Sequence, residues 1–305
     1  MNVDQQPVPT PARTRRGALR FLRPGRRGVI LLVIFALVAG TGITLAITTS
    51  HSKPIATPVP PPPTVQPTPV ASPTFANWPD AASTGVPSSA GPLRKVDRLT
   101  VTKSGTFYSH LDVSNCVDIE ADNITITQSI IHCGRGAPAV HVFEGRKNLT
   151  LDQVEIDGSG KSAACVGYDG FAIFRSNLHD CADGIDFGSD VTIQLCFIHD
   201  LARHKGSHND ALQTVGGSND VIKDNTLEAY RADTGDLMNS AIQTGHLKGD
   251  LVNVLVEHNF MDGGNYTVNA GSTSRSGHTI SGYVFKDNVF GRHSRYGPVQ
   301  AVGDG

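Results

Sequence analysis

The feature that most constrains the fold of this chain is a short strand pattern that recurs seven times. Each copy is an apolar–x–apolar strand, then a small or amide residue, then another apolar residue. The copies are ITITQSII (124–131), LTLDQVEI (149–156), FAIFRSNL (171–178), VTIQLCFI (191–198), DVIKDNTL (220–227), VLVEHNFM (254–261) and YVFKDNVF (283–290). Their starts lie 20 to 34 residues apart, which is typical of a solenoid whose coils bury apolar faces only by stacking on neighbours.

The alternation within each copy predicts β-strands, and no long stretch after the N-terminal region has a helical period. The sixth position of the repeat reads Ser129, Val154, Ser176, Cys196, Asn225, Asn259 and Asn288. Three consecutive asparagines at one stacked position predict an internal amide ladder, in which each side chain bonds to the next coil. Residues 76–305 are therefore predicted to form an all-β domain, a solenoid of about seven to eight coils, and the resemblance described next implies that it is a single-stranded right-handed parallel β-helix.

The repeat resembles the right-handed parallel β-helix proteins of the pectate-lyase-like superfamily over roughly residues 95–298. The segments NWPDAASTGVP (77–87), GSHNDALQ (206–213) and KDNTL (223–227) are similar to secreted and surface bacterial members of that group. The resemblance implies the fold and a polysaccharide ligand. It does not select a reaction, because this fold carries lyases, hydrolases, epimerases and non-enzymatic adhesins.

The N-terminal region has the composition of a membrane anchor. Residues 1–27 form a basic tail with seven arginines, and an uncharged apolar stretch follows at 28–49. About 20 apolar residues cross a hydrocarbon core of ~30 Å, whereas a secretory signal has a shorter apolar region of ~7–15 residues. We therefore expect an uncleaved single-pass anchor in the cell membrane, with the arginines and the N-terminus in the cytoplasm.

The segment that follows the anchor is predicted to be a disordered, proline-rich spacer at residues 50–75, because proline fixes φ and lacks an amide donor. The domain at 76–305 would then be extracellular. Beyond residue 53, 18 basic residues face 27 acidic ones, a net charge of −9. Such a domain does not attract polyanions at long range, so we expect no nucleic-acid partner.

The five cysteines contain no CxxC pair, which argues against a zinc or thioredoxin-type site. An extracellular location permits disulfides, and Cys116–Cys133 and Cys181–Cys196 are possible pairs. Spacing alone does not determine the connectivity. Cys165 and Cys196 fall at inward positions, where cysteine acts as a small hydrophobe.

A second strand of each coil carries the candidate chemistry. It reads DGIDF (183–187), DALQT (210–214), SAIQT (240–244) and NYTVN (265–269). Inward positions are expected at Ile185, Leu212, Ile242 and Thr267, and outward ones at Gly184, Asp186, Ala211, Gln213, Ala241 and Gln243. Stacked strands lie ~4.8 Å apart, so Asp183 should lie beside Asp210. Such a pair serves acid–base chemistry or binds Ca²⁺, or it merely caps strand starts.

The loops before these strands add further candidates. They lengthen from 5 residues in the third coil to 12 and 13 in the next two, and long loops on a rigid scaffold tend to carry binding residues. The catalytic candidates are His208, Asp210, Asp183, Lys205 and Arg231, with Lys205 and Arg231 neutralising a substrate carboxylate. The substrate-binding candidates are Gln213, Asp186, Gln243, Tyr230 and His199. The alternative for the loop charges is plain solvation.

Two functions remain open. The first is a lyase or epimerase of a uronic-acid-containing polysaccharide, since both reactions begin by removing a proton next to a carboxylate, with a Ca²⁺ ion or a basic side chain stabilising the charge. Calcium at Asp183 and Asp210 is the one cofactor considered. The second is a non-catalytic surface protein that binds cell-wall or host glycan. The anchor and spacer favour it, although one Trp and six Tyr offer little stacking surface.

Overall fold

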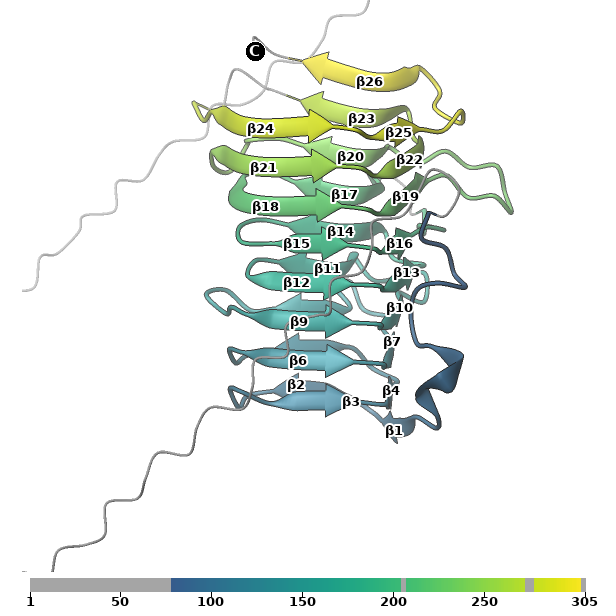
Figure 1. Ribbon diagram of the computed structural model, residues 1–305, viewed down its shortest axis with the longest axis vertical. Helices are drawn as coiled ribbons and strands as arrows, with labels where there is room; N and C mark the ends of the chain where they lie inside the picture. The colour runs from purple at the N-terminus through teal and green to yellow at the C-terminus, as the bar shows by residue number, and fades with distance from the viewer. Residues whose placement is uncertain (1–77, 204–206, 272–276, 303–305) are drawn as a thin grey trace, which may run out of the picture. The chain divides into compact units, whose positions relative to one another are not determined.

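The domain is a stack of parallel strands in three sheets (Figure 1). The computed structural model describes residues 78–203, 207–271 and 277–302. In these ranges the only helix is a 3-10 turn, η1 (Ser88–Ala90), and no helix has the length and apolar character that a membrane span requires. The predicted basic tail at 1–27, anchor at 28–49 and spacer at 50–75 lie outside the described residues, as does Lys205.

Each complete coil contributes one strand to each sheet, and the sheets are named A, B and C. Sheet A comprises β1 (Arg94–Val96), β4 (Leu111–Val113), β7 (Ile130–His132), β10 (Glu155–Asp157), β13 (Asn177–His179), β16 (Phe197–Ile198), β19 (Thr226–Ala229), β22 (Phe260–Gly263) and β25 (Val289–Phe290). Sheet B comprises β2 (Leu99–Val101), β5 (Val117–Ile119), β8 (Val140–Val142), β11 (Ala164–Tyr168), β14 (Asp183–Phe187), β17 (Asp210–Thr214), β20 (Ser240–Thr244), β23 (Tyr266–Gly271) and β26 (Gly297–Val302). Sheet C comprises β3 (Phe107–Ser109), β6 (Ile124–Thr127), β9 (Leu149–Asp152), β12 (Phe171–Phe174), β15 (Thr192–Gln194), β18 (Gly217–Lys223), β21 (Leu251–Glu257) and β24 (Ile280–Lys286).

This architecture confirms the predicted all-β parallel β-helix. Sheets A and B each have nine strands and sheet C has eight, so the stack is slightly longer than the repeats indicate. The additional strands precede the first repeat copy. There the strands have three residues each and β1 is largely exposed, so they carry too little apolar alternation to be recognised.

The turn from sheet C to sheet A explains why small and amide residues recur at the sixth position of the repeat. Its fifth residue is left-handed in every copy, with φ between 46° and 60°, at Gln128, Gln153, Arg175, Leu195, Asp224, His258 and Asp287. A single residue of this conformation turns the chain sharply, so the next side chain faces the interior. That next position is the sixth of the repeat, which holds the small and amide residues.

The predicted amide ladder is confirmed. The side-chain oxygen of Asn259 accepts hydrogen bonds from both the backbone amide and the side-chain amide of Asn225, at 3.0 and 2.9 Å. Asn288 accepts the same pair from Asn259, each at 2.9 Å. Asn225 in turn accepts the amide of Cys196 at 2.9 Å. Each buried amide therefore satisfies the turn of the preceding coil.

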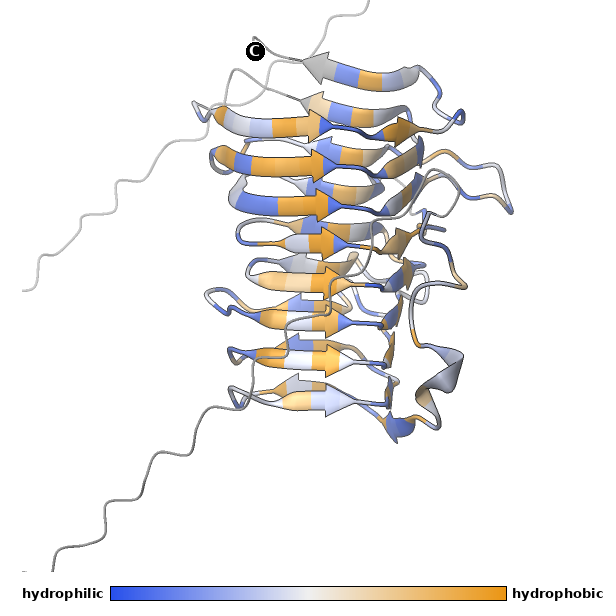
Figure 2. Cartoon of the chain, in the orientation of Figure 1, coloured by the Kyte–Doolittle hydropathy of each residue, from blue (hydrophilic) through white to orange (hydrophobic). Residues whose placement is uncertain are grey.

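The core is one continuous apolar column along the stack, visible as recurring apolar positions in successive strands (Figure 2). In sheet A its inward row is fully buried at Ile131, Ile156, Leu178, Ile198, Leu227 and Met261. The segment before β1 runs along the outer side of sheet A (Figure 1). There the Gly85 amide donates to the Arg175 carbonyl at 2.9 Å, and Trp78 lies 4.8 Å from the His258 ring.

The disulfides are partly as suggested by the sequence. Cys116 is bonded to Cys133, but the suggested Cys181–Cys196 pair is wrong, because Cys181 is bonded to Cys165 and Cys196 is a free buried thiol. Cys196 occupies the ladder position of its coil. Cys165 lies in β11 and Cys181 precedes the stacked strand β14, so the two meet where sheet A turns into sheet B. The inward placement of Cys165 and Cys196 is confirmed.

The predicted alignment of sheet B holds in its centre and fails at two points. Asp186 pairs with Gln213 and Ile185 with Leu212, as expected. Ile242 pairs with Val268, so the expected alignment of Thr267 with Ile242 is wrong by one residue. Ala211 and Ala241, expected to face outward, are fully buried. In each of these strands the second residue lies at the corner with sheet A, before the alternation of inward and outward side chains begins.

The amide ladder gives a first prediction. Replacing Asn259 by Ala leaves two donors of Asn225 without their acceptor inside the core, at about 1–3 kcal/mol for each group left unsatisfied. The thermal midpoint should fall by roughly 5–10 °C, measured by circular dichroism. Asn115→Ala, which removes an exposed amide bonded to Asp97, is the control and should cost much less; equal losses would contradict the ladder's role.

A buried acid gives a second prediction. Asp220 is fully buried between Val191 and Val254 in the inward row of sheet C, where burial raises its pKa to about 8, and its Oδ1 accepts the Val191 amide at 3.0 Å. Between pH ~4 and 8 the folded state holds a proton that the unfolded state has released, so this group lowers stability progressively as pH rises.

Asp220→Asn keeps the acceptor and cannot ionise. At pH 8 its thermal midpoint should exceed that of the wild type by at least ~2–4 °C, equivalent to about 1 kcal/mol, and the gain should vanish near pH 4. Thermal melts across this pH range test it. A gain independent of pH would show that packing, and not ionisation, is responsible.

Candidate functional site

The outer face of sheet B carries one side chain per coil in a single register, here called the sheet B row. Its members are Asp118, His141, Gly167, Asp186, Gln213, Gln243, Asn269 and Gln300. Successive members are one strand spacing apart, ~4.8 Å. The row is therefore a straight, polar track across the coils, and only Gly167 contributes no side chain to it.

Three carboxyl groups gather in the third and fourth coils, two in β14 and one at the start of β17, and form the carboxyl cluster of Asp183, Asp186 and Asp210. The Asp183 Oδ1 accepts the backbone amide of Asp210 at 2.8 Å. Asp210 is fully buried, and its Oδ1 accepts hydrogen bonds from the Ser240 hydroxyl and from the Asn239 amide, the latter at 2.8 Å. The predicted neighbourhood of Asp183 and Asp210 is thus confirmed.

The cluster is poised for proton exchange near neutral pH. Burial, then the negative charge of Asp186, raises the pKa of Asp183 to about 8. Burial and the charge of Asp210 raise the pKa of Asp186 to about 7. Burial raises the pKa of Asp210 to about 6, although hydrogen bonds from Ser240 and Asn239 and the nearby His208 oppose it. Groups with such different protonation equilibria can act as acid and base together.

Two oxygens of the cluster are unused. Among the residues described, neither Asp186 Oδ1 nor Asp210 Oδ2 has a hydrogen-bond partner, although both atoms are buried. A buried carboxyl oxygen without a partner is costly unless a proton, a cation or a ligand satisfies it. The donor set, carboxylate oxygens with the amides of Gln213 and Gln243 alongside, suits Ca²⁺ as well as a sugar hydroxyl.

A cleft of about 170 Å³ lies next to the cluster, between the two long loops. It is lined by Arg203, Ser207, His208, Asn209, Leu237, Met238, Asn239, Asn265 and Arg295. His208 is exposed there, and Asn239 joins the cleft to the carboxyl cluster through its bond to Asp210. The two long loops thus lie beside sheet B. The predicted residues His208 and Asp210 are close to each other there, since the charge of His208 acts to lower the pKa of Asp210.

Three residues near the carboxyl cluster were not among the site residues predicted from the sequence. Lys248 lies on the other flank of the cluster, in a shallow groove with Gly216 and Gly217, and its charge acts to lower the pKa of Asp186. Arg295 reaches the cleft from the loop before β26. Asn239 could have been found, because an asparagine precedes the second strand in three successive coils, at Asn209, Asn239 and Asn265.

Three other predicted residues lie elsewhere, at the corner cluster on the edge of sheet A. The Arg231 guanidinium binds Asp180 at 3.1 Å and Asp233 at 3.2 Å, and it donates to the Asp200 carbonyl at 2.8 Å. The His199 ring stacks on Phe197 at 3.9 Å and contacts Asp200 at 2.7 Å. Tyr230 stacks on His293 at 4.2 Å. These contacts hold the long loops onto the solenoid.

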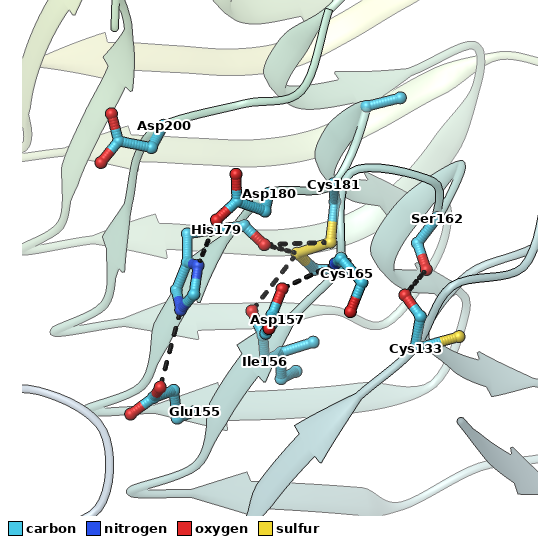
Figure 3. The surroundings of a disulfide bond; sticks show 12 residues. Cys133, Glu155, Ile156, Asp157, Ser162, Cys165, His179, Asp180, Cys181 and Asp200 are labelled. Atoms are coloured by element: carbon cyan, nitrogen blue, oxygen red, sulfur yellow. Dashed lines mark hydrogen bonds and ion pairs between the residues drawn. A yellow bond between two sulfur atoms is a disulfide. The ribbon is translucent and has the colours of Figure 1, made fainter. Parts of the chain in front are cut away.

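The corner cluster contains one group of possible metal ligands, Asp157, His179 and Asp180, beside the Cys165–Cys181 disulfide (Figure 3). His179 lies between the carboxylates of Glu155 and Asp180, at 3.6 and 2.9 Å. Burial opposes its charge, but these two carboxylates raise the pKa of His179 to about 9. Arg231 adds a second cation at Asp180, so we interpret this corner as an ion-pair network.

The structure therefore brings together Asp183, Asp186, Asp210, His208, Gln213 and Gln243 on the sheet B side, and places Arg231, Tyr230 and His199 at the corner. Comparison of the chain with protein-family models, with curated proteins and with solved structures finds no match. The site must accordingly be understood from its own geometry.

Proposed function

We propose that this protein acts on an extracellular polysaccharide at the carboxyl cluster, as a lyase or epimerase of a uronic-acid-containing glycan. The observation that carries the proposal is the half-buried Asp186, whose Oδ1 has no partner among the described residues, in the outward row of sheet B next to an open cleft. The resemblance of the repeat to the pectate-lyase-like superfamily supports the same substrate class. The anchor at 28–49 and the spacer at 50–75 would hold the domain outside the cell membrane.

The reaction would begin with removal of the proton beside the sugar carboxylate. Asp186, half-buried with a pKa of about 7, is the best-placed base, since it is the cluster member that belongs to the outward row. Asp183, with a pKa of about 8, remains protonated at neutral pH and could return a proton to the leaving oxygen or to the ring. Asp210 is fully buried, so it would not contact the substrate. Its negative charge would instead help to keep the pKa values of Asp183 and Asp186 raised.

The substrate carboxylate needs positive charge nearby. Arg231 is occupied by Asp180 and Asp233, so Lys248 and the cleft residues Arg203 and Arg295 are better placed for this role than Arg231. A Ca²⁺ ion at Asp183 and Asp210 would be an alternative source of that charge, and it would require Asp183 to be ionised, so the returned proton would then come from another group. His208 would assist from the cleft by exchanging protons with solvent or with Asp210.

A second candidate function is glycan binding without catalysis. The observation that favours it is the complete burial of Asp210, which keeps one of the two predicted acid–base partners out of reach of any ligand. The polar row of Gln213, Gln243 and Asn269 would then be a recognition track alone.

The test of catalysis uses the full chain with a panel of uronate polymers, with and without Ca²⁺. Elimination is followed by absorbance from unsaturated chain ends and epimerisation by NMR of the product. Asp186→Asn should lower kcat by about 10²-fold or more, because it removes a general base. Asp220→Asn is the control, since this carboxyl is also buried, with a pKa raised to about 8, but lies in sheet C.

The pH profile gives a further expectation. Activity should need Asp186 ionised and Asp183 protonated, so the profile should be bell-shaped, with limbs near the pKa values of about 7 and 8. Asp183→Asn should remove the alkaline limb. Turnover that survives in Asp186→Asn would refute the assignment of the base, and glycan binding without any turnover would establish the second candidate function.

A further inference from the structure

We infer that Phe143, His141 and Tyr168 form an aromatic subsite that stacks on one sugar ring of an acidic polysaccharide, on the N-terminal side of the carboxyl cluster. This inference rests on the proposed function and deepens it, because it assigns a binding position and a direction to the glycan. The chain would lie along the sheet B row, parallel to the solenoid axis, with one sugar unit passing over each coil or so.

The first observation is the exposure of the rings. Phe143 is 39% exposed and Tyr168 43% exposed, and His141 bridges them, with its ring 4.4 Å from that of Phe143 and 6.1 Å from that of Tyr168. The His141 and Tyr168 rings meet at 90°. Most other large apolar side chains exposed in the described ranges lie in the last coil, at Ile280, Val284, Tyr296 and Val299.

The second observation is the register of the sheet B row. His141 pairs with Gly167, and Gly167 pairs with Asp186, so the histidine and the carboxyl cluster are two strands apart on one face of sheet B. Gly167 itself is buried, and a Cβ there would lie 3.3 Å from the Pro138 side chain and 3.6 Å from the Asp186 Cβ. The exposed surface here is therefore made by the rings and not by the glycine.

The third observation ties the rings to the proposed chemistry. The negative charge of Asp186, after burial, raises the pKa of the Tyr168 hydroxyl, so that hydroxyl lies within electrostatic range of the proposed base. Tyr168 follows Gly167 in β11, and Gly167 pairs with Asp186 on the adjacent strand β14. The aromatic subsite and the carboxyl cluster are neighbouring parts of one surface.

The chemistry of the surface selects a sugar. A pyranose presents an apolar face of C–H groups and a rim of hydroxyls, which matches rings flanked by hydrogen-bonding groups. One coil further from the cluster, Asp118 accepts hydrogen bonds from both Arg98 and Arg135, the latter at 2.7 Å, and the charge of Asp97 also lies near Arg98. Arg98 is 54% exposed there, and its guanidinium can bind a sugar carboxylate.

The test measures binding and turnover by the full chain, with an oligogalacturonate and a neutral cello-oligosaccharide of equal length as probes in calorimetry. Phe143→Leu and Tyr168→Leu should each weaken binding of both probes by about 3- to 10-fold, while Tyr168→Phe retains it, because the ring and not the hydroxyl stacks. Phe107→Leu is the control, since Phe107 is 62% exposed on sheet C. Thermal melts confirm that each variant folds.

A separate variant tests the acidic character of the ligand. Arg98→Gln should weaken binding of the oligogalacturonate by about 3- to 10-fold and leave the neutral probe unchanged, since it removes only a charge. Equal effects on both probes would overturn the assignment of a carboxylate to this position.

The outcomes separate this inference from the proposed function. If the wild type turns over a polymer and Tyr168→Leu keeps the same KM and affinity, the subsite is wrong and the acid–base assignment stands. If no polymer is turned over but binding depends on Phe143 and Tyr168, the subsite stands and the catalytic proposal fails. If neither probe binds the wild type, the subsite is wrong.

Discussion

The whole structure depends on hydrogen bonding between coils in an exact parallel register. No coil of this solenoid encloses a core of its own, so each strand needs the strand above and the strand below it, as in the pairing of β11 with both β8 and β14. Register determines which side chains face inward, because a slip of one residue exchanges the two faces. The outer polar row of sheet B and the inner apolar column are therefore consequences of the same constraint.

Buried polar groups show how the same environment has opposite effects on amides and acids. Asn225 and Asn259 face the core and are satisfied by neighbours that carry the same amide one coil away. Asp220 faces the same core without a neighbour of this kind, so burial raises its pKa to about 8 and makes it a source of instability at alkaline pH. In the carboxyl cluster the same effect of burial yields groups that exchange protons near neutral pH.

The two polar regions of the domain differ in whether their carboxyl groups are paired. At the corner cluster, Arg231 and His179 face Asp180 and Glu155, and the resulting ion pairs hold long loops on the scaffold. At the carboxyl cluster, two buried oxygens lack partners among the described residues. Such a site has free energy to gain from a ligand, which is the physical basis for proposing function at sheet B and a structural role at the corner.

The sequence by itself determined the parallel β-helix, the amide ladder and the neighbourhood of Asp183 and Asp210, because these follow from a local repeat that stacks in register. It did not determine the Cys165–Cys181 bond, the inward turn of Ala211 or the pairing of Ile242 with Val268, since loop lengths and corners vary from coil to coil. It also grouped Arg231 and His199 with His208, although their loops carry them to a different corner. Only the tertiary structure decided these points. The position of a side chain on a long loop depends on the contacts that hold the loop in place, and those contacts come from residues distant in the chain.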